Sequence, residues 1–210
     1  MIWLAFYLHK DIHPEPAYMI SKTFLMGIVL APIAAIAQLL FGVQFGGYPI
    51  LFVLFAAFVE EIVKYLAVKF IVLHDAEFDE PVDAMIYMIV AGLGFAAIEN
   101  ILVLYRSIDA GLTVAFKVLL FRFVGATLLH ALSTGLIGYF LALSWFYDAH
   151  RVKLLWAGIA LATLFHFTFN IFLVTLGNDN GFFYSTLILI LMAGLVSILF
   201  SKIRARAQAS

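Results

Sequence analysis

Long apolar runs alternate with short polar segments along the whole chain. About 20 apolar residues at about 1.5 Å each cross a hydrocarbon core of about 30 Å, and six runs reach that length. They cover residues 20–43, 49–73, 82–104, 118–145, 154–176 and 182–203. A shorter apolar stretch at residues 1–7 predicts a helical stub. The pattern therefore predicts an all-α, polytopic transmembrane helix bundle of six full spans plus an N-terminal stub, forming one domain over residues 1–210.

The composition supports this interpretation. Hydrophobic residues make up 65% of the chain and charged residues 12%, and the mean hydropathy is +1.09, which excludes a soluble globular domain. The net charge of −1 gives no sign of a nucleic-acid partner, so the expected surroundings are the lipid bilayer. Cysteine is absent, which excludes disulfides, thiolate metal sites and a cysteine nucleophile.

Basic residues collect in alternate connections between the predicted spans. One set of connections carries Lys10, Lys22, Lys69, Arg151, Lys153, Lys202, Arg204 and Arg206, and the other carries Arg106 and Lys117. Cytoplasmic connections are the ones enriched in lysine and arginine. We therefore expect the C-terminus and the acidic linker at residues 74–81 to be cytoplasmic.

The second apolar run contains three ionisable side chains near its middle, Glu60, Glu61 and Lys64. A charge at the centre of a bilayer costs on the order of 3 kcal/mol, and helical spacing places all three on one face. One interpretation is a purely structural ion pair between Glu60 and Lys64. Because one lysine neutralises one carboxylate, the second glutamate requires a further partner.

Three other runs carry polar groups at similar depth. These groups are Glu99, Asn100, Arg122, His130, His166 and Asn170. Singly, each has a plain structural explanation, such as a glutamate paired with Arg122 or an asparagine joining two helices. Together, Glu60, Glu99, His130, His166 and Asn170 lie about 9 to 20 Å from the outer ends of their spans, so they converge on one layer. Glycines and alanines at residues 92–97 predict close helix packing and also room for a chain to enter between helices.

Two imidazoles with two or three carboxylates allow two hydrolytic mechanisms. In one, both histidines and a glutamate bind a divalent ion that activates water, and zinc suits this ligand set best. In the other, Glu60 or Glu61 activates water while the histidines and Asn170 stabilise the oxyanion. The spacing does not choose between them. The His-Glu-x-x-His, Gly-x-Ser and Gly-x-Gly-Asp motifs of other intramembrane proteases are absent.

Four motifs in this order resemble the PrsW family of intramembrane proteases, which is distantly similar to the CAAX prenyl endopeptidases. They are Glu60-Glu61-x-x-Lys64, Gly92-x-Gly94-Phe95-x-x-x-Glu99-Asn100, His130-Ala131-Leu132-Ser133-Thr134-Gly135 and His166-x-x-x-Asn170. The resemblance implies that Glu60, Glu61, Glu99, His130 and His166 are catalytic, with Lys64, Asn100, Arg122 and Asn170 in support. Glu99, His130 and His166 are the expected metal ligands.

The resemblance also implies a substrate and a location. The substrate would be a single-pass membrane protein such as an anti-sigma factor, and the enzyme would lie in the cytoplasmic membrane of a prokaryote. The depth of the polar layer, nearer the outer ends of the spans, separately predicts a cut near the extracytoplasmic face. Two alternatives remain. A proton- or cation-coupled transporter would also hold carboxylates and histidines at mid-membrane, although short loops and the lack of internal repeats disfavour it. An inactive member of the same fold would bind a membrane partner without cutting it.

Overall fold

The computed structural model describes residue 5 and residues 14–209. Within them the chain forms seven long helices and no strand: α2 (Ala17–Phe45), α3 (Pro49–Ile71), α4 (Asp83–Ser107), α5 (Leu112–Val124), α6 (Ala126–Phe146), α7 (Arg151–Thr175) and α8 (Asn178–Ala207). Short 3-10 turns lie at Ile108–Ala110 and Asp148–His150. The all-helical prediction is confirmed. Apart from Ala5, the predicted stub at residues 1–7 lies outside the described residues.

Five helical stretches in the described residues are long and apolar enough to cross a membrane. They are Ala17–Phe45, Asp83–Ala110, Leu112–Phe146, Asp148–Thr175 and Asp179–Ala207. Such stretches identify an integral membrane protein. The remaining long helix, α3, is not among them because three charged residues, Glu60, Glu61 and Lys64, lie close together in its middle.

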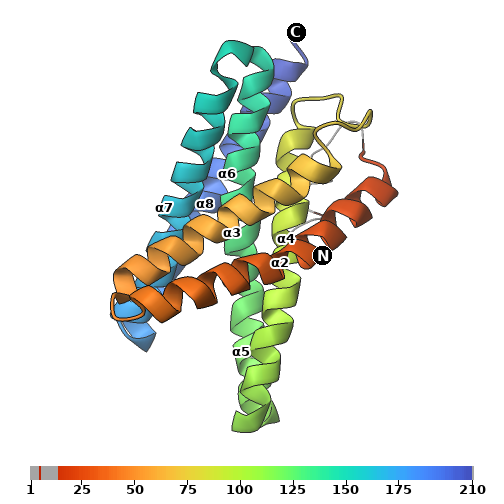
Figure 1. Ribbon diagram of the computed structural model, residues 1–210. Helices are drawn as coiled ribbons and strands as arrows, with labels where there is room; N and C mark the ends of the chain where they lie inside the picture. The colour runs from red at the N-terminus through yellow and green to blue at the C-terminus, as the bar shows by residue number, and fades with distance from the viewer. Residues whose placement is uncertain (1–4, 6–13, 210) are drawn as a thin grey trace.

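The fourth predicted span differs from the structure in its boundaries. The polar connection expected at residues 106–117 is largely helical, since α4 continues to Ser107 and α5 begins at Leu112. The turn between them ends at Gly111, whose φ of 98° is a conformation that glycine adopts without strain. Gly125 then separates α5 from α6. The hairpin of α4 and α5 projects beyond the other connections at that end of the bundle (Figure 1).

Helices α4 and α6 form the centre of the bundle, with α2 and α3 lying across them as an antiparallel pair (Figure 1). Helix α7 packs against α6 and α3, and α8 packs against α6 and α7. The first half of α4, from Asp83 to Ala96, is buried throughout. This arrangement brings the middle of α3 close to α4, α6 and α7.

Glycines on α4 allow the close contacts in this centre. A β-carbon at Gly94 would collide with the carbonyl oxygen of Phe24 on α2. One at Gly92 would lie 2.7 Å from the carbonyl oxygen of His130 on α6. The predicted close packing is therefore confirmed. The same glycines leave no room for a substrate chain, contrary to our expectation, because neighbouring backbones occupy the space.

Candidate active site

The three ionisable side chains near the middle of α3 share one face, as predicted, and all are buried. Glu60 is 6% exposed, while Glu61 and Lys64 are fully buried. The Lys64 ammonium lies 2.8 Å from Oε1 of Glu61 and 3.8 Å from Oε2 of Glu60, and it sits over the ring of Phe95. The closer ion pair of Lys64 is thus with Glu61, whereas the structural interpretation had paired it with Glu60.

Glu61 joins three helices through one carboxylate oxygen. Its Oε1 accepts hydrogen bonds from Lys64 Nζ on its own helix and from Ser133 Oγ of α6, both at 2.8 Å. It also lies 2.7 Å from Nδ1 of His166 on α7. Because a carboxylate only accepts, we assign the proton of His166 to Nδ1, which leaves Nε2 with a free lone pair. Glu61 therefore fixes the orientation of the His166 ring.

Glu99 orients the second histidine, His130, in the same way. Its Oε2 lies 2.8 Å from Nε2 of His130 and accepts a hydrogen bond from Arg122 at 3.0 Å. Arg122 also donates to Asn100 at 2.8 Å, and Asn100 in turn donates to Thr127 at 2.8 Å. The predicted pairing of Glu99 with Arg122 is confirmed. By the same reasoning the proton of His130 is on Nε2 and the lone pair on Nδ1.

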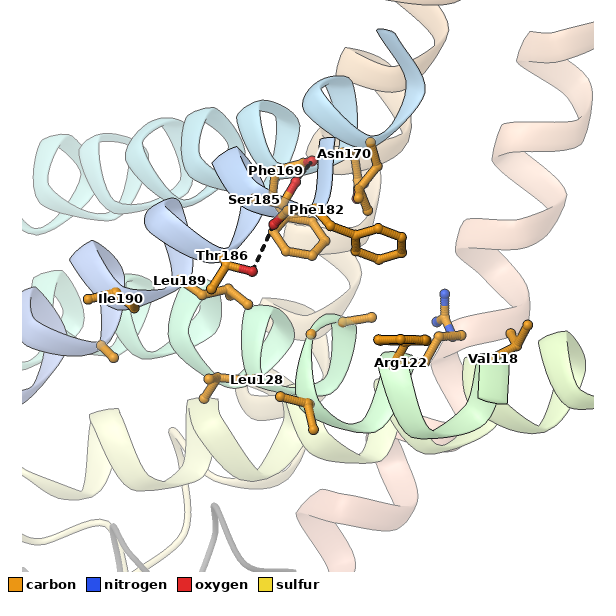
Figure 2. A pocket seen from close by; sticks show the side chains of 16 residues that line it. Val118, Arg122, Leu128, Phe169, Asn170, Phe182, Ser185, Thr186, Leu189 and Ile190 are labelled. Atoms are coloured by element: carbon orange, nitrogen blue, oxygen red, sulfur yellow. Dashed lines mark hydrogen bonds between the residues drawn. The ribbon is translucent and has the colours of Figure 1, made fainter. Parts of the chain in front are cut away.

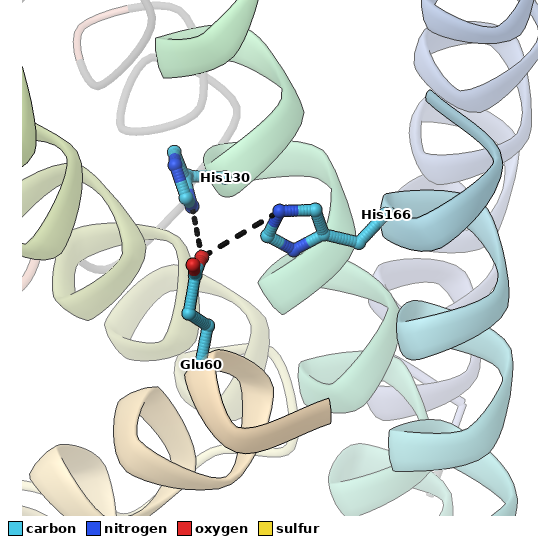
Figure 3. A group of neighbouring side chains, drawn as sticks. All are labelled: Glu60, His130 and His166. Carbon is cyan, nitrogen blue, oxygen red and sulfur yellow. Dashed lines mark ion pairs between the residues drawn. The ribbon is translucent and has the colours of Figure 1, made fainter. Parts of the chain in front are cut away.

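The free nitrogens of both histidines point to one carboxylate oxygen, Oε2 of Glu60 (Figure 3). The distances to Oε2 are 3.9 Å from His130 Nδ1 and 3.5 Å from His166 Nε2. The second oxygen of Glu60 accepts a hydrogen bond of 2.9 Å from Gln38 of α2. One donor atom from each of Glu60, His130 and His166 therefore faces a common point, and these atoms all lie within 4.8 Å of one another.

This three-residue group has the features of a metal site. Oε2 of Glu60 and Nδ1 of His130 are buried without a hydrogen-bond partner in the described part of the chain, which is costly unless a ligand satisfies them. Ligands about 2.1 Å from a tetrahedral ion lie roughly 3.4 Å apart. Oε2 of Glu60 lies somewhat further, 3.5 and 3.9 Å, from the two imidazole nitrogens. Each imidazole also donates its other N–H to a carboxylate, the usual support of a metal-binding histidine. The donor set fits zinc.

The structure changes two roles expected from the sequence. Glu60, in place of Glu99, faces the two histidines, since Glu99 approaches His130 from its other nitrogen. Asn170 is half-buried on α7 and lines a separate groove beside Arg122. It does not belong to the three-residue group.

Sequence reasoning gave no role to Gln38 or Ser133. Gln38 is a lone amide in the otherwise apolar second half of the first predicted span. A single polar residue in an apolar span could have identified Gln38 as a candidate partner of the buried charges. Ser133 lies three residues after His130, inside a motif for which the sequence predicted no role other than that of His130.

Comparison with known proteins places the chain in a family. The family described as PrsW family intramembrane metalloprotease matches residues 15–197. Protease PrsW of Bacillus subtilis (strain 168) is 34% identical over 177 residues, covering 82% of this chain and 78% of the relative. Protease PrsW of Geobacillus kaustophilus (strain HTA426) is 33% identical over 163 residues, covering 77% and 69%.

A third relative extends the coverage. Protease PrsW of Oceanobacillus iheyensis is 31% identical over 188 residues, covering 89% of this chain and 81% of the relative. No solved structure matches the chain. Since the family match spans most of the sequence and includes all four motifs, the chain belongs to the PrsW family of intramembrane proteases and is a peptidase.

Proposed function

We propose that the protein is an intramembrane endopeptidase that hydrolyses single-pass membrane proteins at the group formed by Glu60, His130 and His166. The observation that carries this proposal is the convergence of two buried, unpartnered atoms and a third donor on one point at the middle of the bundle. A purely structural cluster would be expected to pair its own polar atoms. Here Oε2 of Glu60 and Nδ1 of His130 have no partner at the centre of the group, while the other nitrogen of each imidazole contacts a carboxylate.

In this proposal Glu60, His130 and His166 hold a zinc ion. When bound, zinc would make its water molecule acidic enough to lose a proton near neutral pH. Gln38 holds one oxygen of Glu60 so that the other faces the histidines. Glu61 and Glu99 each orient one imidazole and fix its tautomer.

A metal-free mechanism uses the same residues differently. Oε2 of Glu60 would accept the proton of water directly. The histidine N–H groups would keep their hydrogen bonds to Glu61 and Glu99. Glu60 is the carboxylate nearest the reacting water in both mechanisms. Metal content, described below, separates them.

We further propose that α3 crosses the membrane as the sixth span. Its three central charges are buried inside the bundle, where Lys64 lies 2.8 Å from Glu61, so they do not meet lipid. The connections rich in basic residues lie at the same end of the bundle as the C-terminus (Figure 1). This arrangement supports a cytoplasmic C-terminus in the cytoplasmic membrane of a prokaryote.

The function is tested by incubating purified protein in detergent with a model single-pass substrate. We expect cleavage by the unchanged chain and none by Glu60→Gln, with both proteins equally folded. His74→Ala is the control, because His74 is exposed in the connection after α3. An unchanged chain that never cleaves, but carries ions across liposome membranes, would establish the transporter instead.

Elemental analysis tests the metal. We expect one zinc per chain in the purified protein and its loss from the double variant His130→Ala, His166→Ala. The matched control changes the exposed pair His74 and His150 to alanine and should retain zinc. Absence of stoichiometric metal together with activity that resists chelators would favour the glutamate-water mechanism.

A further inference from the structure

A largely apolar groove of about 500 Å³ opens beside the candidate active site. One wall comes from α5 and the start of α6, and the other from the end of α7 and the first half of α8 (Figure 2). Its lining includes Val118, Phe121, Leu128, Leu173, Leu189 and Ala193. The volume lies in the range of ligand-binding clefts. We propose that this groove binds the unwound segment of the membrane substrate next to the bond that is cut, an inference that rests on the proposed function.

Each wall of the groove contains a polar residue that lies close to one of the two histidines or to its carboxylate partner. Arg122 on α5 lines the groove and donates to Glu99, which lies 2.8 Å from His130. Asn170 on the facing wall lies one helical turn after His166 on α7. A chain in the groove would therefore lie within a few ångströms of the residues that support the three-residue group.

The polar groups of the groove suit a peptide better than a lipid tail. Arg122 and Asn170 bring N–H donors into apolar walls. The hydroxyls of Ser185 and Thr186 donate to the carbonyl oxygens of Phe169 and Phe182 at 3.1 and 2.7 Å, which leaves both hydroxyl oxygens free to accept. An unwound backbone presents both N–H and C=O groups, and within a membrane each needs a partner. An acyl chain would use none of these groups.

The groove also has a route from the bilayer. Helix α5 packs against α4 and α6, while the groove lies between α5 and the pair α7 and α8. Only Ala115 of α5 is buried, so most of this helix faces outward. Gly125 lines the groove without a side chain where α5 gives way to α6. A transmembrane helix could thus approach sideways and place one unwound end in the groove.

A second groove of about 620 Å³ provides an internal control. It lies between α2, α3 and α7, and its lining includes Phe41, Leu54, Phe55, Trp156 and Ala160. Thr163 is its one polar lining residue, and the residues that contact Glu99 or the two histidines do not line it. A bulky residue placed there should leave substrate binding unchanged.

The first experiment compares Ala193→Trp, which fills the proposed groove, with Ala160→Trp, which fills the second groove. We expect the KM for a model single-pass substrate to rise at least tenfold in Ala193→Trp, with zinc content unchanged, and to stay within twofold of the unchanged chain in Ala160→Trp. Equal KM values in the two variants would overturn the proposal. An unchanged chain that cleaves nothing would reject the proposed function itself, a distinguishable result.

The second experiment does not depend on cleavage. A photo-crosslinking residue is placed at Leu189 in the proposed groove, or at Leu54 in the second groove, in the Glu60→Gln background. We expect crosslinks from position 189 to the substrate, within a few residues of its cut site, and none from position 54. Crosslinks from position 189 to lipid alone would identify an acyl-chain site and overturn the proposal.

Discussion

The charges of individual residues favour a cation at the proposed metal site. Glu60, Glu61 and Glu99 meet only Lys64 and Arg122 within the cluster. One negative charge is left over in a buried region, where an unpaired charge is costly. A divalent ion at Glu60 Oε2 would offset it and would satisfy the unpartnered nitrogen of His130. The same count explains why Lys64 is fully buried, since its charge is needed beside Glu60 and Glu61.

Changing Lys64 to methionine should therefore cost both stability and activity. The substitution leaves Glu61 buried without its counter-charge, a loss of about 3 to 5 kcal/mol in comparable buried pairs. We expect a clear drop in the thermal denaturation midpoint in detergent and loss of cleavage. The double variant Lys64→Met, Glu61→Gln removes both charges and should regain part of the stability while staying inactive. A single variant as stable as the unchanged chain would show that the pair is dispensable.

Gln38 offers a test of positioning without a change of charge. In Gln38→Leu, Oε1 of Glu60 loses its 2.9 Å hydrogen bond and the carboxylate is free to turn away from the histidines. Losing such a supporting contact typically weakens metal binding about 10- to 100-fold. Zinc competition with a chelator measures this, and Gln44→Leu, at an exposed position on the same helix, is the control. Equal zinc affinity in the two variants would remove Gln38 from the site.

At the scale of helices, the sequence predicted which elements carry the site but not how their side chains meet. Length and hydropathy locate the helices, and the motifs locate Glu60, His130 and His166 on three of them. Which glutamate faces both imidazoles depends on the tilt of α3 across the bundle and on the orientation of each ring. Sequence spacing within single helices carries no information on either. The choice of Glu60 over Glu99 therefore required the structure.

Two glycines on different helices test the role of close packing between α2 and α4. Gly94→Ala would push a methyl group into the Phe24 carbonyl, and overpacking of this kind costs about 1 to 3 kcal/mol. In Gly194→Ala the new methyl group meets open space, so the better helix propensity of alanine should raise stability by up to about 1 kcal/mol. Thermal inactivation of both variants in the same detergent compares them. A Gly94→Ala variant as stable as Gly194→Ala would contradict the packing described for α4.

At the scale of the whole molecule, the connections between helices fall at two opposite ends of the bundle (Figure 1). The C-terminus shares one end with the α3–α4 and α6–α7 connections. The α2–α3, α4–α5 and α7–α8 turns lie at the other end, which the distribution of basic residues predicts to be extracytoplasmic. Asn170 lies five residues before the end of α7, or about 8 Å from that end.

The proposed groove extends the site towards this outer end, which predicts where a substrate is cut. Its α8 lining starts at Phe182, four residues after the helix begins, and reaches Ala193 at the middle of the helix. A substrate helix must unwind before a water molecule can attack its backbone, and unwinding is easiest near a span end or at small residues. We therefore expect a cut at or just inside the outer membrane boundary of a single-pass protein, releasing its extracytoplasmic part and leaving a membrane stump. Mass spectrometry of the fragments locates the cut, and reporters fused after Ser210 give the orientation independently. A cut in the cytoplasmic half of the substrate, with a C-terminus shown to be cytoplasmic, would mean that substrates do not enter through the groove between α5 and α8.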